Sequence, residues 1–377
     1  MRSWQSQLVL LLVLASVARA QTASPEAAIA FEQQQKWPEA VAVWKSVTAR
    51  NPNDAAAFAS LGVDLAREQK YPEAAVAYQR ALKLDPKLPG VQLDLGLAEF
   101  KQGRFTAAIP ALRAALAADP SSTQTHILLG LSYYGSKQFA LAVQLLQPVA
   151  EADPTNAQLH QTLAQSCLFA KQLACAEEQF RQLLQQDPDS APTHILMGEA
   201  LDGLERTPEA IAEFQAAAKV SPNEPNVHFG LGYLYWKSHQ YEEARAEFER
   251  ELAIDPRHAQ ALAYLGDIEW KNDHPEAALP LLQKAIRANP ELRIAYVDEG
   301  TIYLQQKKYK EAEAALSKAV ALEPSQPDAH YQLGRLYQAL GKTADAEREL
   351  RKVRELHDQK DSLVGKIPAA QNSADPK

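Results

Sequence analysis

Apolar residues along residues 55–88 recur with the spacing of two amphipathic helices. Pro72 suits the first turn of the second helix, where its missing N–H group costs nothing, and Pro86 ends that helix. The first helix carries its apolar residues at i, i+3, i+4 and i+7: Phe58, Leu61, Gly62 and Leu65. The apolar face of the second holds Ala74, Tyr78, Ala81 and Leu82. The segment is therefore predicted to be a helix–turn–helix hairpin.

The same pattern returns every 34 residues along almost the whole chain. Helix-ending prolines stand at this interval: Pro52, Pro86, Pro120, Pro154, Pro188, Pro222, Pro256, Pro290 and Pro324. We number the 34 positions of each repeat as slots 1 to 34. Slot 8 holds glycine in eight of the ten repeats and slot 20 holds alanine in all ten. Small residues at these slots predict a close crossing of the two helices in every repeat.

This pattern resembles the tetratricopeptide repeat family, which has a 34-residue helix–turn–helix unit. The resemblance covers about residues 21–360 and implies an all-α, right-handed solenoid (superhelix), in which each repeat contacts mainly its neighbours. The ten expected repeats span 21–54, 55–88, 89–122, 123–156, 157–190, 191–224, 225–258, 259–292, 293–326 and 327–360. In repeat eight Pro275 comes one residue earlier than usual, which predicts a shortened turn. Residues 361–377 show no periodicity and are predicted to be a disordered tail.

Residues 1–20 have the features of a secretory signal peptide. A basic start is followed by a short apolar run and by Ala18-Arg19-Ala20, an A-x-A cleavage pattern. We expect cleavage after Ala20 and a secreted or periplasmic protein, with an uncleaved N-terminal anchor as the alternative. No later segment is apolar enough to span a membrane. The net charge of −8, without any basic block, argues against nucleic acid as a partner.

Both cysteines belong to repeat five, on either side of its inter-helix turn. In an exported protein Cys167 and Cys175 could form a disulfide across this turn, or they could be two buried thiols. Five histidines share slot 4, but successive copies would be about one helix pair apart, which is too far to share a metal ion. They are His126, His160, His194, His228 and His330. The sequence contains no catalytic motif, so we expect neither an enzyme nor a bound cofactor or metal.

The resemblance implies that the first helices line a concave binding surface, with slots 2, 5, 9, 12 and 13 facing inward. These slots contain two apolar zones. One consists of Leu93, Leu97, Phe100, Ile127, Leu131 and Tyr134; the other consists of Phe229, Tyr233, Trp236 and Trp270. Slot 13 adds four cations: Arg67, Lys101, Lys237 and Lys271. Aromatic rings with nearby cations can hold an extended or helical peptide that carries acidic groups.

Part of this apolar set is expected to pack between repeats, because slot 12 side chains often lie between successive first helices. Tyr233 and Trp236 are the preferred groove residues, since aromatic side chains with polar tips are favoured at interfaces. The sequence thus predicts an exported, non-enzymatic scaffold that binds a protein or peptide, in envelope assembly or secretion. The alternatives are a self-associating structural protein of the envelope and a glycan-binding module.

Overall fold

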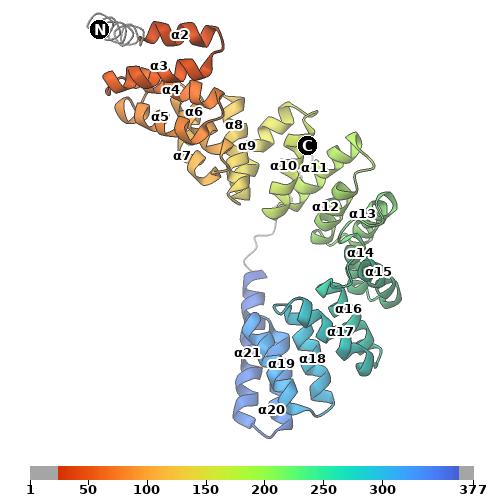
Figure 1. Ribbon diagram of the computed structural model, residues 1–377. Coiled ribbons are helices and arrows are strands. Elements are labelled where there is room, and N and C mark those ends of the chain that lie inside the picture. The colour runs from red at the N-terminus through yellow and green to blue at the C-terminus, as the bar shows by residue number, and fades with distance from the viewer. Residues whose placement is uncertain (1–23, 365–377) are drawn as a thin grey trace, which may run out of the picture. The chain divides into compact units, whose positions relative to one another are not determined.

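The computed structural model describes residues 24–364, which contain helices and no strands. The chain divides after Pro188 into two compact halves. Figure 1 shows each half as a stack of antiparallel helix pairs, one pair per repeat. The predicted all-α repeat architecture is therefore confirmed. The predicted signal peptide lies outside the described residues.

The helices begin and end at the same slots in nearly every repeat. The N-terminal half contains α2 (Pro25–Gln33), α3 (Trp37–Arg50), α4 (Ala55–Arg67), α5 (Tyr71–Leu84), α6 (Val91–Lys101), α7 (Phe105–Ala118), α8 (Thr123–Gly135), α9 (Phe139–Ala152), α10 (Ala157–Phe169) and α11 (Leu173–Gln186). The C-terminal half contains α12 (Ala191–Gly203), α13 (Thr207–Val220), α14 (Val227–Lys237), α15 (Tyr241–Ile254), α16 (Ala259–Lys271), α17 (Pro275–Ala288), α18 (Arg293–Gln305), α19 (Tyr309–Leu322), α20 (Pro327–Ala339) and α21 (Thr343–Val364).

Each hairpin turns through a residue at slot 15 with a positive φ angle. The φ angle is +60° at Gln69 and +59° at Lys307, and only Gly103 and Gly341 place a glycine there. The following N–H group closes the turn on the first helix: Lys70 N donates to the Leu65 carbonyl at 2.9 Å. This is the Schellman arrangement that satisfies the last carbonyl groups of a helix. The turn therefore has the same backbone conformation whether or not slot 15 holds a glycine.

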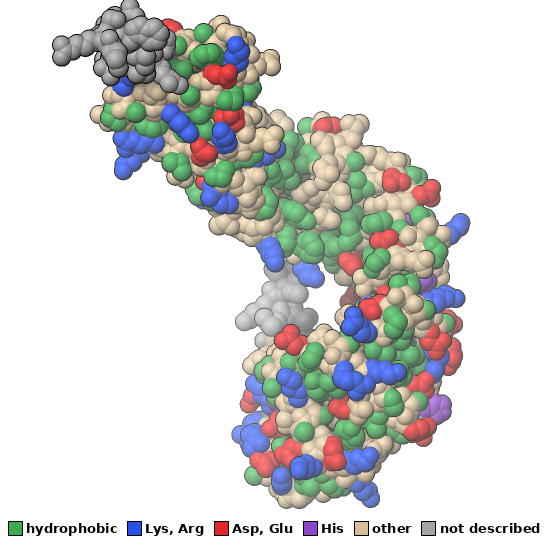
Figure 2. Space-filling model, viewed as in Figure 1, with side chains coloured by type: hydrophobic (Ala, Val, Ile, Leu, Met, Phe, Trp, Pro, Cys, Tyr) green, Lys and Arg blue, Asp and Glu red, His purple; other side chains and the backbone are tan. Residues whose placement is uncertain are grey.

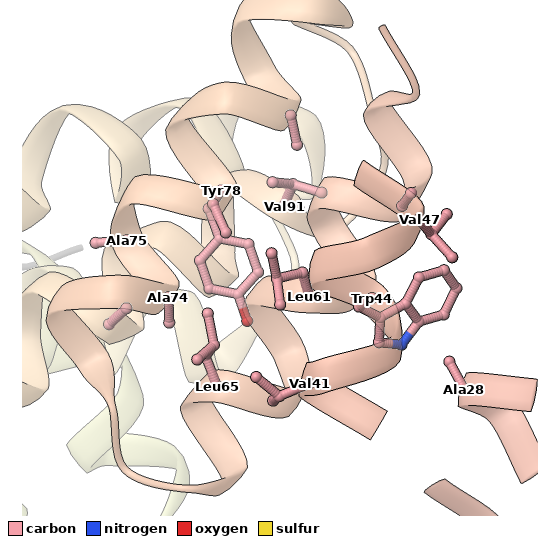
Figure 3. Close-up of a cluster of buried hydrophobic side chains, with 14 residues drawn as sticks. Ala28, Val41, Trp44, Val47, Leu61, Leu65, Ala74, Ala75, Tyr78 and Val91 are labelled. Carbon is pink, nitrogen blue, oxygen red and sulfur yellow. The ribbon is translucent and has the colours of Figure 1, made fainter. Parts of the chain in front are cut away.

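The close crossing predicted at slot 8 is present. A Cβ atom added at Gly62 would lie 2.5 Å from the Tyr78 ring, and one added at Gly232 would lie 2.7 Å from the Phe248 ring. Both contacts are shorter than van der Waals separation, so the slot 24 side chain occupies the space that glycine leaves. Figure 3 shows the Tyr78 ring beside Leu61 and Leu65 in the core of the first repeats. The slot 20 alanines, such as Ala74, are fully buried behind it.

Four of the slot 4 histidines pair with a side chain 19 residues later, on the second helix of the same repeat. The Nδ1 atoms of His160, His194, His228 and His330 lie 2.6–2.7 Å from Gln179, Glu213, Glu247 and Glu349, respectively. His126 lacks such a partner because Leu145 stands at the matching position; its Nδ1 lies 3.0 Å from the Ser122 carbonyl oxygen. These histidines join the two helices of a repeat.

Two boundaries differ from those predicted. The turn of repeat eight has the usual length, because α17 begins at slot 17 like the other second helices and Pro275 is simply its first residue. The prediction of a shortened turn was wrong. The last helix, α21, continues beyond residue 360 to Val364. Residues 365–377, most of the predicted disordered tail, lie outside the described residues. No described helix is long and apolar enough to cross a membrane.

Candidate binding surface

The first helices of successive repeats contact one another within each half, as α14 contacts α16 and α16 contacts α18. We call the surface that they expose the first-helix face. It carries the two apolar zones predicted from the sequence, and all of their side chains are half-buried. The zones differ in how their rings are arranged and in which of their side chains are free to contact a partner.

In the zone on α14, the rings form one continuous cluster with a tyrosine of α16. We define the aromatic cluster as Phe229, Tyr233, Trp236 and Tyr264. Tyr264 stands at its centre, with ring centroids 5.7 Å from Tyr233 and 4.8 Å from Trp236. Tyr264 also stacks on the ring of Phe248 in α15, with the two ring centroids 5.7 Å apart. Burial raises the pKa of Tyr264 to about 12, and the neighbouring Tyr233 makes the next largest contribution.

Sequence reasoning missed Tyr264 because it occupies slot 6, outside the expected inward slots. A spacing rule could have indicated it, because slot 12 side chains contact residues 28 or 31 positions later, on the first helix of the next repeat. Trp236 meets Tyr264 at the first spacing and Asp267 at the second. In the other half, Tyr134 donates to Gln165 Oε1 at 2.7 Å, again 31 residues away. Slot 12 thus packs against slots 6 and 9 of the next repeat.

Trp236 is held firmly in this cluster. Its Nε1 donates to Asp267 Oδ2 at 2.5 Å, and the Lys271 ammonium lies 4.9 Å from the centroid of its ring. Lys271 also pairs with Asp267, which is buried. Tyr233 is different, since its hydroxyl makes no hydrogen bond with any residue of the described chain. The Tyr233 hydroxyl is therefore available to a bound partner.

A buried carboxylate fixes the start of the helix that presents the cluster. Glu251 is 2% exposed and accepts hydrogen bonds from the backbone N–H groups of Asn226, at 3.3 Å, and Phe229, at 3.0 Å. Free N–H groups at a helix start favour a negative charge. Most other repeats carry alanine or valine at this slot. Glu251 therefore anchors the helix turn that contains Phe229.

Trp270 is separate from this cluster. The sequence placed it with Tyr233 and Trp236, but the structure places it against the next repeat, in a cavity of about 370 Å³. Thr301 and Leu304 of α18 and Arg335 of α20 line the same cavity. The ring of Trp270 follows the slot 12 rule above. The first-helix face of the C-terminal half thus offers two neighbouring sites rather than one groove zone.

The rings of the apolar zone on α6 and α8 already contact other side chains of the N-terminal half. The Phe100 ring meets Phe105 edge-to-face at 5.4 Å, and the Tyr134 ring meets Phe139 at 5.9 Å. Leu93 lines a cavity at the loop edge, and Leu97, Ile127 and Leu131 are half-buried. Burial also raises the pKa of Asp94. Because the Tyr134 hydroxyl already donates to Gln165 and the rings of Phe100 and Tyr134 already contact other rings, this zone is the weaker binding surface.

Three of the four slot 13 cations already have partners. Lys237 pairs with Asp202 at 2.6 Å, and this hydrogen bond raises its pKa. Lys271 pairs with Asp267, and the Arg67 guanidinium lies 4.5 Å from the centroid of the Trp37 ring. Lys101 makes neither an ion pair nor a cation–π contact with a described residue. The expectation that these cations receive the acidic groups of a peptide therefore lacks support at three positions.

The two cysteines of repeat five are joined by a disulfide. Their Cα atoms are 5.8 Å apart across the turn between α10 and α11, and Cys167 is fully buried. This separation is within the range that a disulfide spans. Within the described residues, no group of three histidine, cysteine or acidic side chains could hold a metal ion.

Sequence profiles of the tetratricopeptide repeat match residues 93–157, 195–259, 229–293 and 265–330. Further profiles of the same repeat match residues 133–200 and 303–367, and another matches 64–103. The chain therefore belongs to the tetratricopeptide repeat family. Repeats of this family typically form non-enzymatic scaffolds that present extended surfaces for protein interaction.

Among similar solved structures, one that covers most of this chain shares its fold. The APC/C hetero-tetramer Cut9–Hcn1 matches with 14% identity and a TM-score of 0.53, over 88% of this chain and 80% of that one. YrrB, described as a TPR protein with an unusual peptide-binding site, is 22% identical over 47% of this chain and 91% of its own, with a TM-score of 0.38. MamA (MSR-1) is 26% identical over 44% and 95%, with a TM-score of 0.40. No curated protein matches the chain in sequence.

Proposed function

We propose that this chain is an exported scaffold that binds a protein or peptide on the first-helix face of its C-terminal half. The observation that carries the proposal is the aromatic cluster, a half-buried set of rings on α16 and on α14, the helix that Glu251 anchors. Rigid aromatic side chains with polar tips give large contact areas at a small entropic cost. Family membership supports the general role, and the sequence of residues 1–20 supports export.

The proposed partner places apolar side chains against Tyr233 and into the Trp270 cavity. Its backbone or a polar side chain accepts a hydrogen bond from the Tyr233 hydroxyl. Acidic residues of the partner are not required, because Lys237 and Lys271 are neutralised by Asp202 and Asp267. The process served by such an exported scaffold is envelope assembly or secretion in our proposal.

The test uses crosslinked capture from an envelope fraction with matched variants. Tyr233→Ala/Trp270→Ala removes one ring from each site and leaves the Trp236–Asp267 network intact. Val220→Ala/Ile254→Ala removes two exposed apolar side chains from second helices, and serves as the control. We expect the first variant alone to lose the partner, after circular dichroism shows equal helicity. Equal recovery with both variants would contradict the proposed surface, and recovery of the chain alone would favour self-association.

Export is tested by the mass of the purified protein. Cleavage after Ala20 predicts an N-terminus at Gln21 for protein recovered from outside the cytoplasm. A mass that retains residues 1–20 would indicate the uncleaved anchor instead.

A further inference from the structure

A cavity of about 630 Å³ lies away from the first-helix face, at the loop that joins repeats seven and eight. The loop residue Arg257 and two side chains of α17, Lys284 and Arg287, supply three cations to its wall. The apolar part of the wall consists of Pro256, Leu262 and Ala288. The volume is within the range of small-molecule sites, about 300–1,000 Å³.

None of these three cations forms an ion pair with a residue of the described chain. Other arginines of the same half are paired: Arg245 with Glu269, and Arg293 with Asp328. The single carboxylate in the wall, that of Asp255, accepts a hydrogen bond from the Arg257 backbone N–H at 3.0 Å. The lining therefore carries a net charge of two positive units, in a chain whose own net charge is −8.

An equivalent cavity at repeats two and three shows which part of this arrangement is special. That cavity, of about 470 Å³, is lined by Pro86, Lys87 and Asp119, which match Pro256, Arg257 and Asn289. At the slot of Lys284 it has Ala114, and at the slot of Arg287 the chain has Ala117. The cavity itself thus follows from the geometry of successive repeats, whereas the cluster of three cations is particular to the junction of repeats seven and eight.

We propose that this cavity binds a phosphoryl group, such as a diphosphate or a phosphate ester. Two guanidinium groups and one ammonium group provide donors for several oxygens of one dianion, and arginine matches phosphate oxygens in a bidentate geometry. The cavity exceeds the size of one phosphate, so an organic group of an ester would contact Pro256 and Ala288. A bound dianion neutralises the net charge of the wall.

Calorimetric titration of the full mature chain with pyrophosphate at low ionic strength tests this site. We expect saturable binding that Lys284→Ala/Arg287→Ala weakens by about tenfold or more, because two charge-assisted contacts are lost. The control, Lys219→Ala/Lys318→Ala, removes two exposed cations from the same two slots in other repeats. It should change the affinity less than about twofold, because surface charge at a distance is screened. The gain-of-function variant Ala114→Lys/Ala117→Arg should add a second binding site.

Absence of saturable binding, or an equal loss in the control variant, would overturn the proposal. Tighter binding of hexaglutamate than of pyrophosphate at the same residues would also overturn it, since the site would then select carboxylates. Vesicles containing phosphatidic acid distinguish the source of the phosphate. Binding to vesicles that depends on Lys284 and Arg287 would assign the site to a lipid headgroup, and binding to pyrophosphate alone would assign it to a soluble phosphate.

Discussion

The Nδ1 atom of His228 lies 2.7 Å from Glu247 Oε2, joining the two helices of repeat seven across their buried interface. The other ring nitrogen of His228 lies 2.9 Å from the Pro222 carbonyl oxygen, so the ring also connects the hairpin to the preceding loop. The same 19-residue spacing recurs in repeats five, six and ten. Repeat eight has leucine at both positions, Leu262 and Leu281. The same two positions at the helix interface therefore hold a hydrogen-bonded pair in some repeats and two leucines in repeat eight.

This relationship predicts a strong coupling between His228 and Glu247. Replacing either residue alone by leucine should lower the free energy of unfolding by about 1–3 kcal/mol, because its partner loses a buried hydrogen bond between the two helices. The double variant His228→Leu/Glu247→Leu reproduces the pair of repeat eight and should cost less than the sum. Urea unfolding followed by circular dichroism measures the cycle. Additive losses in the double variant would show that the two residues act independently.

A buried carboxyl group in repeat two predicts a pH-dependent stability. Asp64 is 1% exposed; burial first, and then the nearby Glu32, raise its pKa to about 7. In the unfolded chain an aspartate titrates near 4. Between these values the folded chain holds the extra proton, so stability is greatest below about pH 4 and falls as the pH rises towards 7.

Replacing Asp64 by asparagine should remove this dependence. We expect Asp64→Asn to be more stable than the wild type at pH 8 by roughly 1–3 kcal/mol and to show a flatter profile between pH 4 and 7. Glu39→Gln, at an exposed carboxylate of the first repeat, is the control. Thermal melts monitored through tryptophan fluorescence would measure the difference. Parallel pH profiles for the wild type and Asp64→Asn would contradict the assignment.

The helix crossing at Gly232 predicts a graded response to side-chain size. Gly232→Leu should destabilise repeat seven by about 3 kcal/mol or more, because the added atoms overlap the Phe248 ring. Gly232→Ala should cost less, since repeat five places Ala164 at the same slot opposite Phe180. Melting temperatures of the two variants measure the gradient. An unchanged melting temperature for Gly232→Leu would show that the crossing is not tight.

The positive φ angle at slot 15 predicts that glycine would make the turn more stable than the residues with a Cβ atom that most repeats have there. Lys307 adopts a φ angle of +59°, in a region that costs about 1–2 kcal/mol for residues with a Cβ atom. Lys307→Gly should raise stability by about 1 kcal/mol, and Gly341→Lys should lower it by a similar amount. Denaturant titration measures both. Stabilisation by Gly341→Lys would contradict this account of the turn.

The disulfide closes a short segment and should contribute moderately to stability. The two cysteines are eight residues apart, and the loss of chain entropy in the unfolded state predicts about 2–3 kcal/mol for a loop of this size. Cys167→Ala/Cys175→Ala should be destabilised by this amount under oxidising conditions. Reduction should bring the wild type to a similar stability, as thermal melts with and without dithiothreitol would show. A wild type that is insensitive to reduction would argue against a stabilising disulfide.

The amino-acid sequence by itself determined the architecture. Prolines every 34 residues, glycine at slot 8 and alanine at slot 20 specify a hairpin and its crossing, because helix ends and backbone approach depend on local chemistry. These features placed Gly232 against the second helix and Trp236 on the first-helix face. The period also implied the family, which the matching profiles confirm.

Only the tertiary structure decided which side chains meet across helices. It places Tyr264 in the aromatic cluster and Trp270 in the wall of a separate cavity, and it pairs Lys271 with Asp267. It also gathered Arg257, Lys284 and Arg287 around one hollow. Such contacts depend on how far one helix is shifted along and rotated against the next. Periodicity reports which face of a helix is buried, but it does not report that shift.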